Sequence, residues 1–187
     1  ALMTNGDASE LSLVFGEREL IVSPPAMIEL GRTRQEETIA ALGEIGLPRA
    51  RVHFLSYPNN GLLELWRTAH WQYRNLFTSR YTRASFSPYR RSVTPQAPYC
   101  GQQALSDVVS VLLQVQPTKV FVTHPKDVHP DHWATNCFVR YGLATIAARD
   151  GEWAKRVEVY GYLIHWSRYP APAKVSLRTD LLPPADL

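Results

Sequence analysis

The chain has 187 residues, of which 45% are hydrophobic and 20% charged, a composition typical of a globular protein with one hydrophobic core. The formal net charge of +3, without a run of lysines and arginines, excludes the usual signature of a nucleic-acid-binding protein. The two cysteines, Cys100 and Cys137, are too few for a disulfide framework. No apolar run reaches the ~18 residues of a membrane span, so we expect a cytoplasmic protein without one.

The N-terminal quarter of the chain predicts a strand, a turn and a long helix. Residues 1–3 are apolar, like the end of a strand, and Asn5-Gly6 marks a turn after them. Residues 8–23 contain two short apolar groups, which we interpret as an inserted hairpin or loop. Residues 27–45 have the apolar spacing of a helix, which a glycine ends.

A second strand, residues 52–55, leads into a loop that contains Asn59. The following segment, about residues 63–99, is rich in aromatic side chains with arginines between them, and a short helix is expected at 63–77. Such a segment can bind sugar rings and anionic groups, or it can form a satellite of the core with a charged rim. The sequence leaves both interpretations open.

The second half of the chain alternates helices and strands, as right-handed βαβ units do. The predicted elements are a helix at 104–114, a strand at 119–122, a helix at 133–149 and a strand at 157–164. We therefore predict an α/β fold, a three-layer sandwich with a mostly parallel, Rossmann-like sheet. The domain would span residues 1–169, followed by a Pro-rich tail at 170–187. No G-x-G-x-x-G motif supports dinucleotide binding.

Three histidines and two aspartates follow the third predicted strand within nine residues: His124, Asp127, His129, Asp131 and His132. Catalytic groups collect in loops beyond the carboxyl ends of parallel strands. Imidazole and carboxylate groups bind zinc and similar ions, and imidazole also transfers protons near neutral pH. The alternative is a polar surface turn, but so many polar groups after a buried strand would be difficult to provide with hydrogen-bond partners.

Residues 120–135, V-F-V-T-H-P-K-D-V-H-P-D-H-W-A-T, resemble the C-terminal signature of the PIG-L, or LmbE-like, de-N-acetylase family. Residues 34–43 are similar to the R-x-x-E…A-x-x-L-G helix of that family, and residues 54–62 to its F-L-G-Y-P-D-G-x-L segment. Residues 97–101, A-P-Y-C-G, are similar to the A-P-Y-x-G of a bacterial subgroup. The resemblance implies a hydrolase that uses zinc or another divalent metal to remove an acetyl group from a small N-acetylglucosaminyl glycoconjugate.

The resemblance also implies roles for individual residues. His132 would be a metal ligand, and His129 would face the substrate carbonyl to stabilise the oxyanion or protonate the leaving amine. Asp131 would orient His129. Arg34 and Asn59 would contact the substrate; Arg34 can equally be half of an i,i+3 surface pair, and Asn59 stands where the family commonly has an acidic residue.

Other polar residues of the motif region have simpler expected roles. We expect Asp127 to fix its loop through backbone N–H groups and His124 to be structural. His165 follows the last predicted strand, and the sequence alone does not show whether it lines the same rim.

The family's other signature, His-Pro-Asp-Asp after the first strand, does not occur in this sequence. The resemblance assigns two metal ligands and the general base to that signature. We therefore expect a domain without its first strand and helix, inactive on its own. One alternative is a non-catalytic, sugar-binding relative that has lost the metal centre; another is an unrelated metal module that uses His124, His129 and His132 together.

Overall fold

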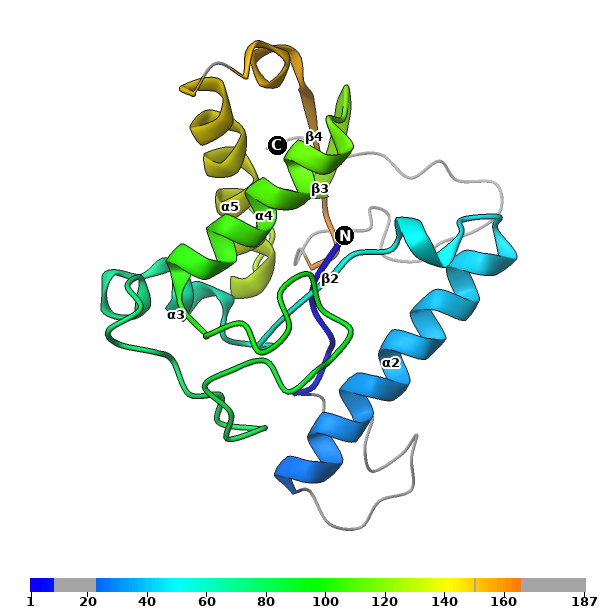
Figure 1. The fold of residues 1–187 in the computed structure, drawn as a ribbon, viewed down its shortest axis with the longest axis vertical. Helices are drawn as coiled ribbons and strands as arrows, with labels where there is room; N and C mark the ends of the chain where they lie inside the picture. Colours follow the sequence, from blue (N-terminus) through cyan, green and yellow to red (C-terminus); the bar gives the residue numbers. More distant parts are fainter. Residues whose placement is uncertain (9–22, 150, 166–187) are drawn as a thin grey trace.

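The structure of the protein is a computed structural model, and it describes residues 1–8, 23–149 and 151–165. The expected hairpin at 8–23, apart from its two end residues, and the expected tail at 170–187 lie outside the described residues, as does the expected domain boundary at 169. The described residues form a mixed α/β fold, as predicted (Figure 1).

Four short strands pair in parallel, which confirms the predicted strand direction. Strand β1 (Leu2–Thr4) pairs with β2 (Phe54–Tyr57), and β3 (Lys119–Thr123) pairs with β4 (Glu158–Tyr162). Among the described residues these make two separate two-stranded sheets rather than one continuous sheet. A single sheet between two helical layers therefore stays a prediction.

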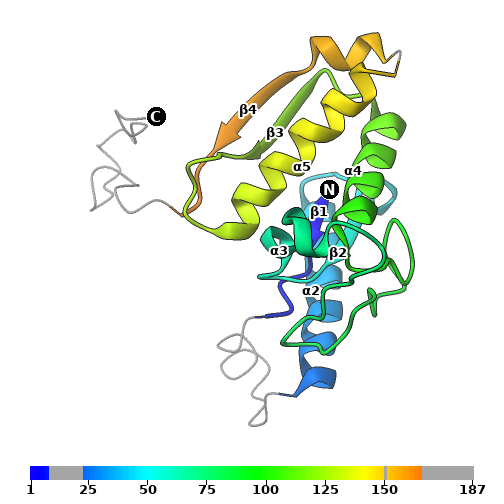
Figure 2. The same ribbon diagram turned by 90° about the vertical axis from the view of Figure 1, so that its left-hand side faces the viewer.

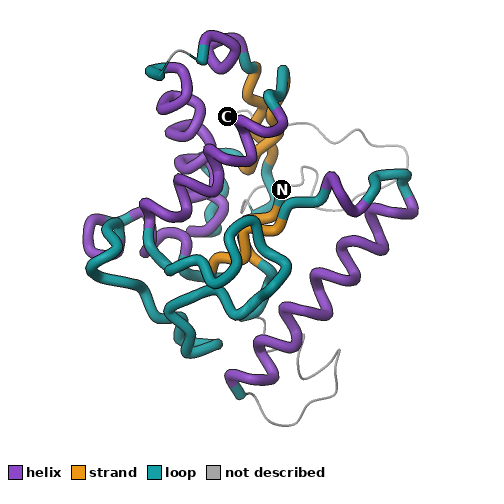
Figure 3. Tube along the Cα trace, viewed as in Figure 1, coloured by secondary structure: helices purple, strands orange, loops and turns teal. Residues whose placement is uncertain are grey.

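Helices supply most of the remaining regular structure (Figure 3). The long helix α2 (Pro24–Glu44) begins at two prolines, and the hydroxyl of its N-cap Ser23 accepts a hydrogen bond from the Ala26 N–H. Helix α4 (Gly101–Val115) and helix α5 (Pro130–Ala147) pack against each other, and α5 lies against β3 (Figure 2). The shorter elements are α3 (Leu62–Trp66) and three 3₁₀ turns, η1 (Arg49–Arg51), η2 (Thr68–His70) and η3 (Glu152–Arg156).

The aromatic segment folds onto α4 and α5, with less helix than expected: α3 and η2 end by residue 70. Trp66 packs edge-on against Phe138 of α5, with ring centroids 4.9 Å apart, and Phe138 is fully buried. Tyr89 and Tyr99 are buried as well. For these side chains the structure favours the core-satellite interpretation over a direct sugar-binding role.

An apolar groove of about 190 Å³ lies between the two sheets. It is lined by Met3 and Leu55 from the β1–β2 side and by Val120 and Val122 of β3, while Val108 and Leu112 of α4 line it from the helical side. Among the described strands, β1 and β3 each pair along one edge only. Open edges of parallel strands beside an apolar groove are unusual, because parallel sheets are normally covered and paired.

No helix within residues 1–8, 23–149 and 151–165 is long and apolar enough to span a membrane. The expected cytoplasmic location stays a prediction.

Candidate functional site

The segments that follow the four strands meet at one side of the fold. The backbone N–H groups of Asn60 and Leu62, after β2, donate to the carboxylate of Asp131 at the start of α5. The backbone N–H of Asn59 donates to Asp7, which follows β1. Within each parallel pair the two carboxyl ends lie at the same edge, and the bonds to Asp131 join the loops of the two pairs, as the sequence predicted for this fold class.

Asp127 holds the motif loop against the end of β4. Its Oδ1 accepts from the His129 N–H at 3.0 Å, the predicted Asx-type bond, which is confirmed. Its Oδ2 accepts from the N–H groups of Ile164 and His165 at 2.8 and 2.9 Å. The sequence did not predict this second pair of bonds, which ties the motif to a segment 37 residues later in the chain.

The imidazole rings of His129, His132 and His165 lie together near Asp127. The ring centroids of His129 and His132 are 4.6 Å apart, and His165 is stacked on His132 with centroids 5.3 Å apart. The structure thus brings the two predicted histidines together and adds His165 to them. The signal for His165 was its position directly after the last strand.

The two motif histidines differ in how their Nδ1 atoms are held. Nδ1 of His132 is buried and lies 3.0 Å from the Asp127 carboxylate, so Nε2 is the ring nitrogen left for a metal or a substrate. Nδ1 of His129 accepts the Asp131 backbone N–H at 3.2 Å. A neutral His129 therefore carries its proton on Nε2.

The pKa of the His129 imidazole is lowered, chiefly because burial disfavours the charged ring. Asp131 opposes this shift, while the neighbouring His132 and His165 add to it. His129 is thereby favoured as a neutral ring that donates an N–H through Nε2.

Asp131 is 4% exposed, and both its oxygens accept loop N–H groups, from Asn60 at 2.6 Å and from Leu62 at 3.0 Å. Burial raises the pKa of this carboxyl, and the two N–H donors oppose the rise. The observed contact between Asp131 and His129 runs through the Asp131 backbone N–H, not through a carboxylate hydrogen bond. The predicted orienting role of the carboxylate stays a prediction.

The two predicted substrate contacts lie near a second buried carboxylate, Asp7. The Asn59 N–H donates to Asp7 at 3.2 Å, and the Asn59 side-chain oxygen accepts from Thr4. Arg34 lies beside the turn after β1, so close that a Cβ added to Gly6 would be 2.9 Å from its Nη1. Both residues therefore lie next to the turn that carries Asp7.

Tyr89 completes this part of the site and was not predicted. Its hydroxyl donates to Asp7 Oδ2 at 2.7 Å. Burial raises the pKa of Asp7, while the bonds from Tyr89 and Asn59 oppose the rise. The aromatic segment gave no periodic signal that singled out Tyr89 from its other tyrosines.

The chemistry of His132 fits a metal ligand, since a carboxylate holds one ring nitrogen and leaves the other open. A catalytic zinc usually needs three protein ligands. Within the part of the chain that the structure describes, no group of three or more His, Cys, Asp or Glu side chains is arranged to hold a metal ion. The described residues thus offer part of a metal site, and not a complete one.

Comparison with known proteins gives one match. The family model described as PIG-L: GlcNAc-PI de-N-acetylase matches residues 1–141, which include the motif, Arg34 and Asn59. No curated protein and no solved structure gave a significant match.

Asp127→Asn tests the anchoring of the motif loop. Burial opposes the charge of Asp127, but the N–H donors from His165, His129 and Ile164 and the His132 ring outweigh it and lower the pKa of the carboxyl to about 2. The folded pKa lies below the ~3.9 of a free aspartate, so the charge stabilises the fold above about pH 4 and loses this effect as the pH falls toward 2. We expect the variant to unfold about 2 kcal/mol more easily at pH 7.

The difference in unfolding free energy between wild type and variant should shrink by about 1 kcal/mol from pH 5 to pH 3. Urea unfolding at each pH measures it. Glu152→Gln is the matched control, because Glu152 is an exposed carboxylate paired with Lys155. An Asp127→Asn variant with the same unfolding free energy as the control at pH 7 would contradict the anchoring role.

Proposed function

The chain belongs to the PIG-L, or GlcNAc-PI de-N-acetylase, family, and on that premise we propose that it is a hydrolase that removes the acetyl group from a small N-acetylglucosaminyl glycoconjugate. Family membership supports a deacetylase-like activity. The observation that carries the proposal for this chain is the pair His129 and His132 at the start of α5, with Asp127 behind His132.

In the proposed reaction His132 would hold zinc or another divalent ion through Nε2, with Asp127 beside its Nδ1. The ion, when bound, supplies an acidic water and polarises the amide carbonyl. As a neutral ring, His129 would donate the N–H of its Nε2 to the developing oxyanion; it would protonate the leaving amine only after taking up the proton that the water releases. Asp131 holds the loop after β2 beside His129, so that a substrate bound by this loop meets the ring.

We further propose that a strand outside the described residues fills the groove between the sheets and carries the remaining ligands. A parallel strand in this position would pair with the open edges of both β1 and β3 and cover Met3 and Val120, which are only partly buried. Its carboxyl end would reach the same side as the loop after β3. The family's His-Pro-Asp-Asp signature, which follows a strand, is suited to that position.

The alternative is a sugar-binding relative without catalysis. It is favoured by the incomplete set of metal-binding side chains among the described residues. The two proposals differ in metal content and turnover, which the following variants measure.

His132→Ala should remove most of the bound zinc, because it deletes a ligand. His129→Ala should keep the zinc but lower turnover of an N-acetylglucosaminide by the ~10²–10⁴-fold typical of an acid–base group. Metal analysis and initial rates of hydrolysis check both. His124→Ala serves as the control, since its ring accepts the Lys126 N–H within the loop. Equal zinc loss in the His129 and His132 variants would refute the assignment.

Arg34→Ala and Asn59→Ala test substrate contact. Each should raise KM or lower kcat/KM by roughly tenfold while zinc content stays unchanged, because each removes a hydrogen-bonding group from the substrate side. Arg49→Ala, an exposed arginine of η1, is the control. Wild-type kinetics in both variants would exclude these residues as substrate contacts.

The proposed strand is tested by supplying it. Residues 1–187 alone should bind zinc weakly, show no deacetylase activity and be poorly soluble. Within the described residues the outer edges of β1 and β3 stay unpaired, and Met3 and Val120, whose full burial is worth up to ~1.5–3 kcal/mol each, stay partly exposed. Addition of an apolar strand ending in His-Pro-Asp-Asp, on the same chain or as a second one, should restore folding, zinc and activity together. A well-folded, active 187-residue protein would show that its own residues complete the site.

A further inference from the structure

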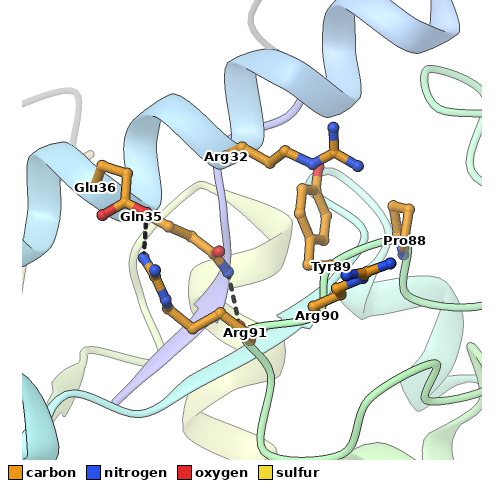
Figure 4. A pocket seen from close by; sticks show the side chains of 7 residues that line it. All are labelled: Arg32, Gln35, Glu36, Pro88, Tyr89, Arg90 and Arg91. Carbon is orange, nitrogen blue, oxygen red and sulfur yellow. Dashed lines mark hydrogen bonds and ion pairs between the residues drawn. The ribbon is translucent and has the colours of Figure 1, made fainter.

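An open pocket of about 410 Å³ lies between α2 and the loop at residues 88–91 (Figure 4). It is lined by Arg32, Gln35, Glu36, Pro88, Tyr89, Arg90 and Arg91. The α2 side chains come from successive turns of one helical face, and the others come from a single short stretch of loop. None of these residues belongs to the motif region.

The pocket carries an excess of positive charge: three arginines against one glutamate give a formal charge of +2. Arg91 pairs with Glu36 at 2.6 Å, and Arg32 pairs with Glu29 outside the pocket at 2.9 Å. Both glutamates are more than 60% exposed, and surface pairs of this kind contribute little, so an anion can compete for the guanidinium groups. Within the described residues Arg90 has no carboxylate partner.

The two neutral polar side chains of the lining, Gln35 and Tyr89, are already hydrogen-bonded. The Tyr89 hydroxyl is occupied by Asp7, and the Gln35 amide donates to the Ser56 hydroxyl and to the Arg91 carbonyl. Gly31 of α2 makes room for Tyr89, since a Cβ there would lie 2.2 Å from the tyrosine oxygen. The donors that remain for a ligand are therefore those of the arginines.

We propose that this pocket binds a phosphate group. Guanidinium is planar, permanently charged and matched to two phosphate oxygens at once, and several such groups around one pocket favour a dianion. The volume lies within the range of small-molecule sites and exceeds what a bare phosphate fills, so an organic phosphate fits.

The pocket is connected to the candidate active site by hydrogen bonds. Tyr89 bonds Asp7, Asp7 accepts from Asn59, and the adjacent Asn60 N–H bonds Asp131 beside the motif histidines. The phosphate can thus belong to the substrate of the proposed hydrolase or to a separate phosphate compound. The first source rests on the proposed function; the binding site itself does not.

The direct test is titration of the metal-free protein, in the form used for hydrolysis assays, with inorganic phosphate and with an organic phosphate ester. Calorimetry or the shift of amide NMR signals reports binding, and metal removal prevents phosphate from binding an ion. The double variant Arg32→Ala/Arg90→Ala should bind at least about tenfold more weakly, because two charge-assisted contacts are lost. Arg90→Lys should retain part of the affinity.

Arg67→Ala is the matched control. Arg67 pairs with Glu64 three residues earlier, as Arg32 does with Glu29, and has the same 57% side-chain exposure, but it lies outside the pocket. Its phosphate affinity should equal that of wild type, and thermal unfolding should confirm that all variants are folded. Absence of phosphate binding by wild type, or equal binding by the double variant, overturns the proposal.

Kinetics separate the two sources. If the phosphate belongs to the substrate, Arg90→Ala raises KM for a phosphorylated N-acetylglucosaminide and leaves a neutral one unchanged. If it belongs to a separate compound, added phosphate changes turnover of the neutral substrate in wild type but not in the double variant. If the chain supplied with the proposed strand binds phosphate but hydrolyses neither substrate, the proposed function is refuted while the phosphate site stands.

Discussion

The site depends on two buried aspartates that accept backbone N–H groups from loops after other strands. Asp127 links the motif to the end of β4, and Asp131 links the start of α5 to the loop after β2. A hydrogen bond from an N–H group to a charged acceptor is roughly twice as strong as one to a neutral acceptor. Loss of either carboxylate would also leave buried backbone N–H groups without a hydrogen-bond partner. The position of the histidines follows from these bonds, since both rings are attached to the segment that the aspartates fix.

The same arrangement separates the roles of two rings that are only three residues apart. The buried Nδ1 of His132 lies 3.0 Å from the Asp127 carboxylate, which leaves Nε2 as the nitrogen that a metal would use. Nδ1 of His129 accepts a hydrogen bond from the Asp131 backbone N–H, so the neutral ring carries its proton on Nε2. A donor to an oxyanion requires this proton. The difference arises because His129 is the N-cap of α5, whereas His132 lies within its first turn.

Much of this was predictable from the sequence, because the motif is local. The Asx bond of Asp127 spans two residues, and the family resemblance of the motif agrees with the match to residues 1–141. Helix α5 was predicted from residue 133 but begins at Pro130; proline at the first helical position was the signal for the earlier start. The strand after residue 52 begins at Phe54 and extends to Tyr57.

What the sequence could not predict were contacts between segments far apart in the chain. Tyr89 reaches Asp7 across 82 residues, and no local pattern marks either residue as the other's partner. Tyr89 thereby takes part in two features: its hydroxyl bonds the Asp7 carboxylate, and the residue lines the arginine-rich pocket. The hydroxyl bond favours the charged form of the Asp7 carboxylate, and the guanidinium groups of Arg32 and Arg90 line the pocket (Figure 4).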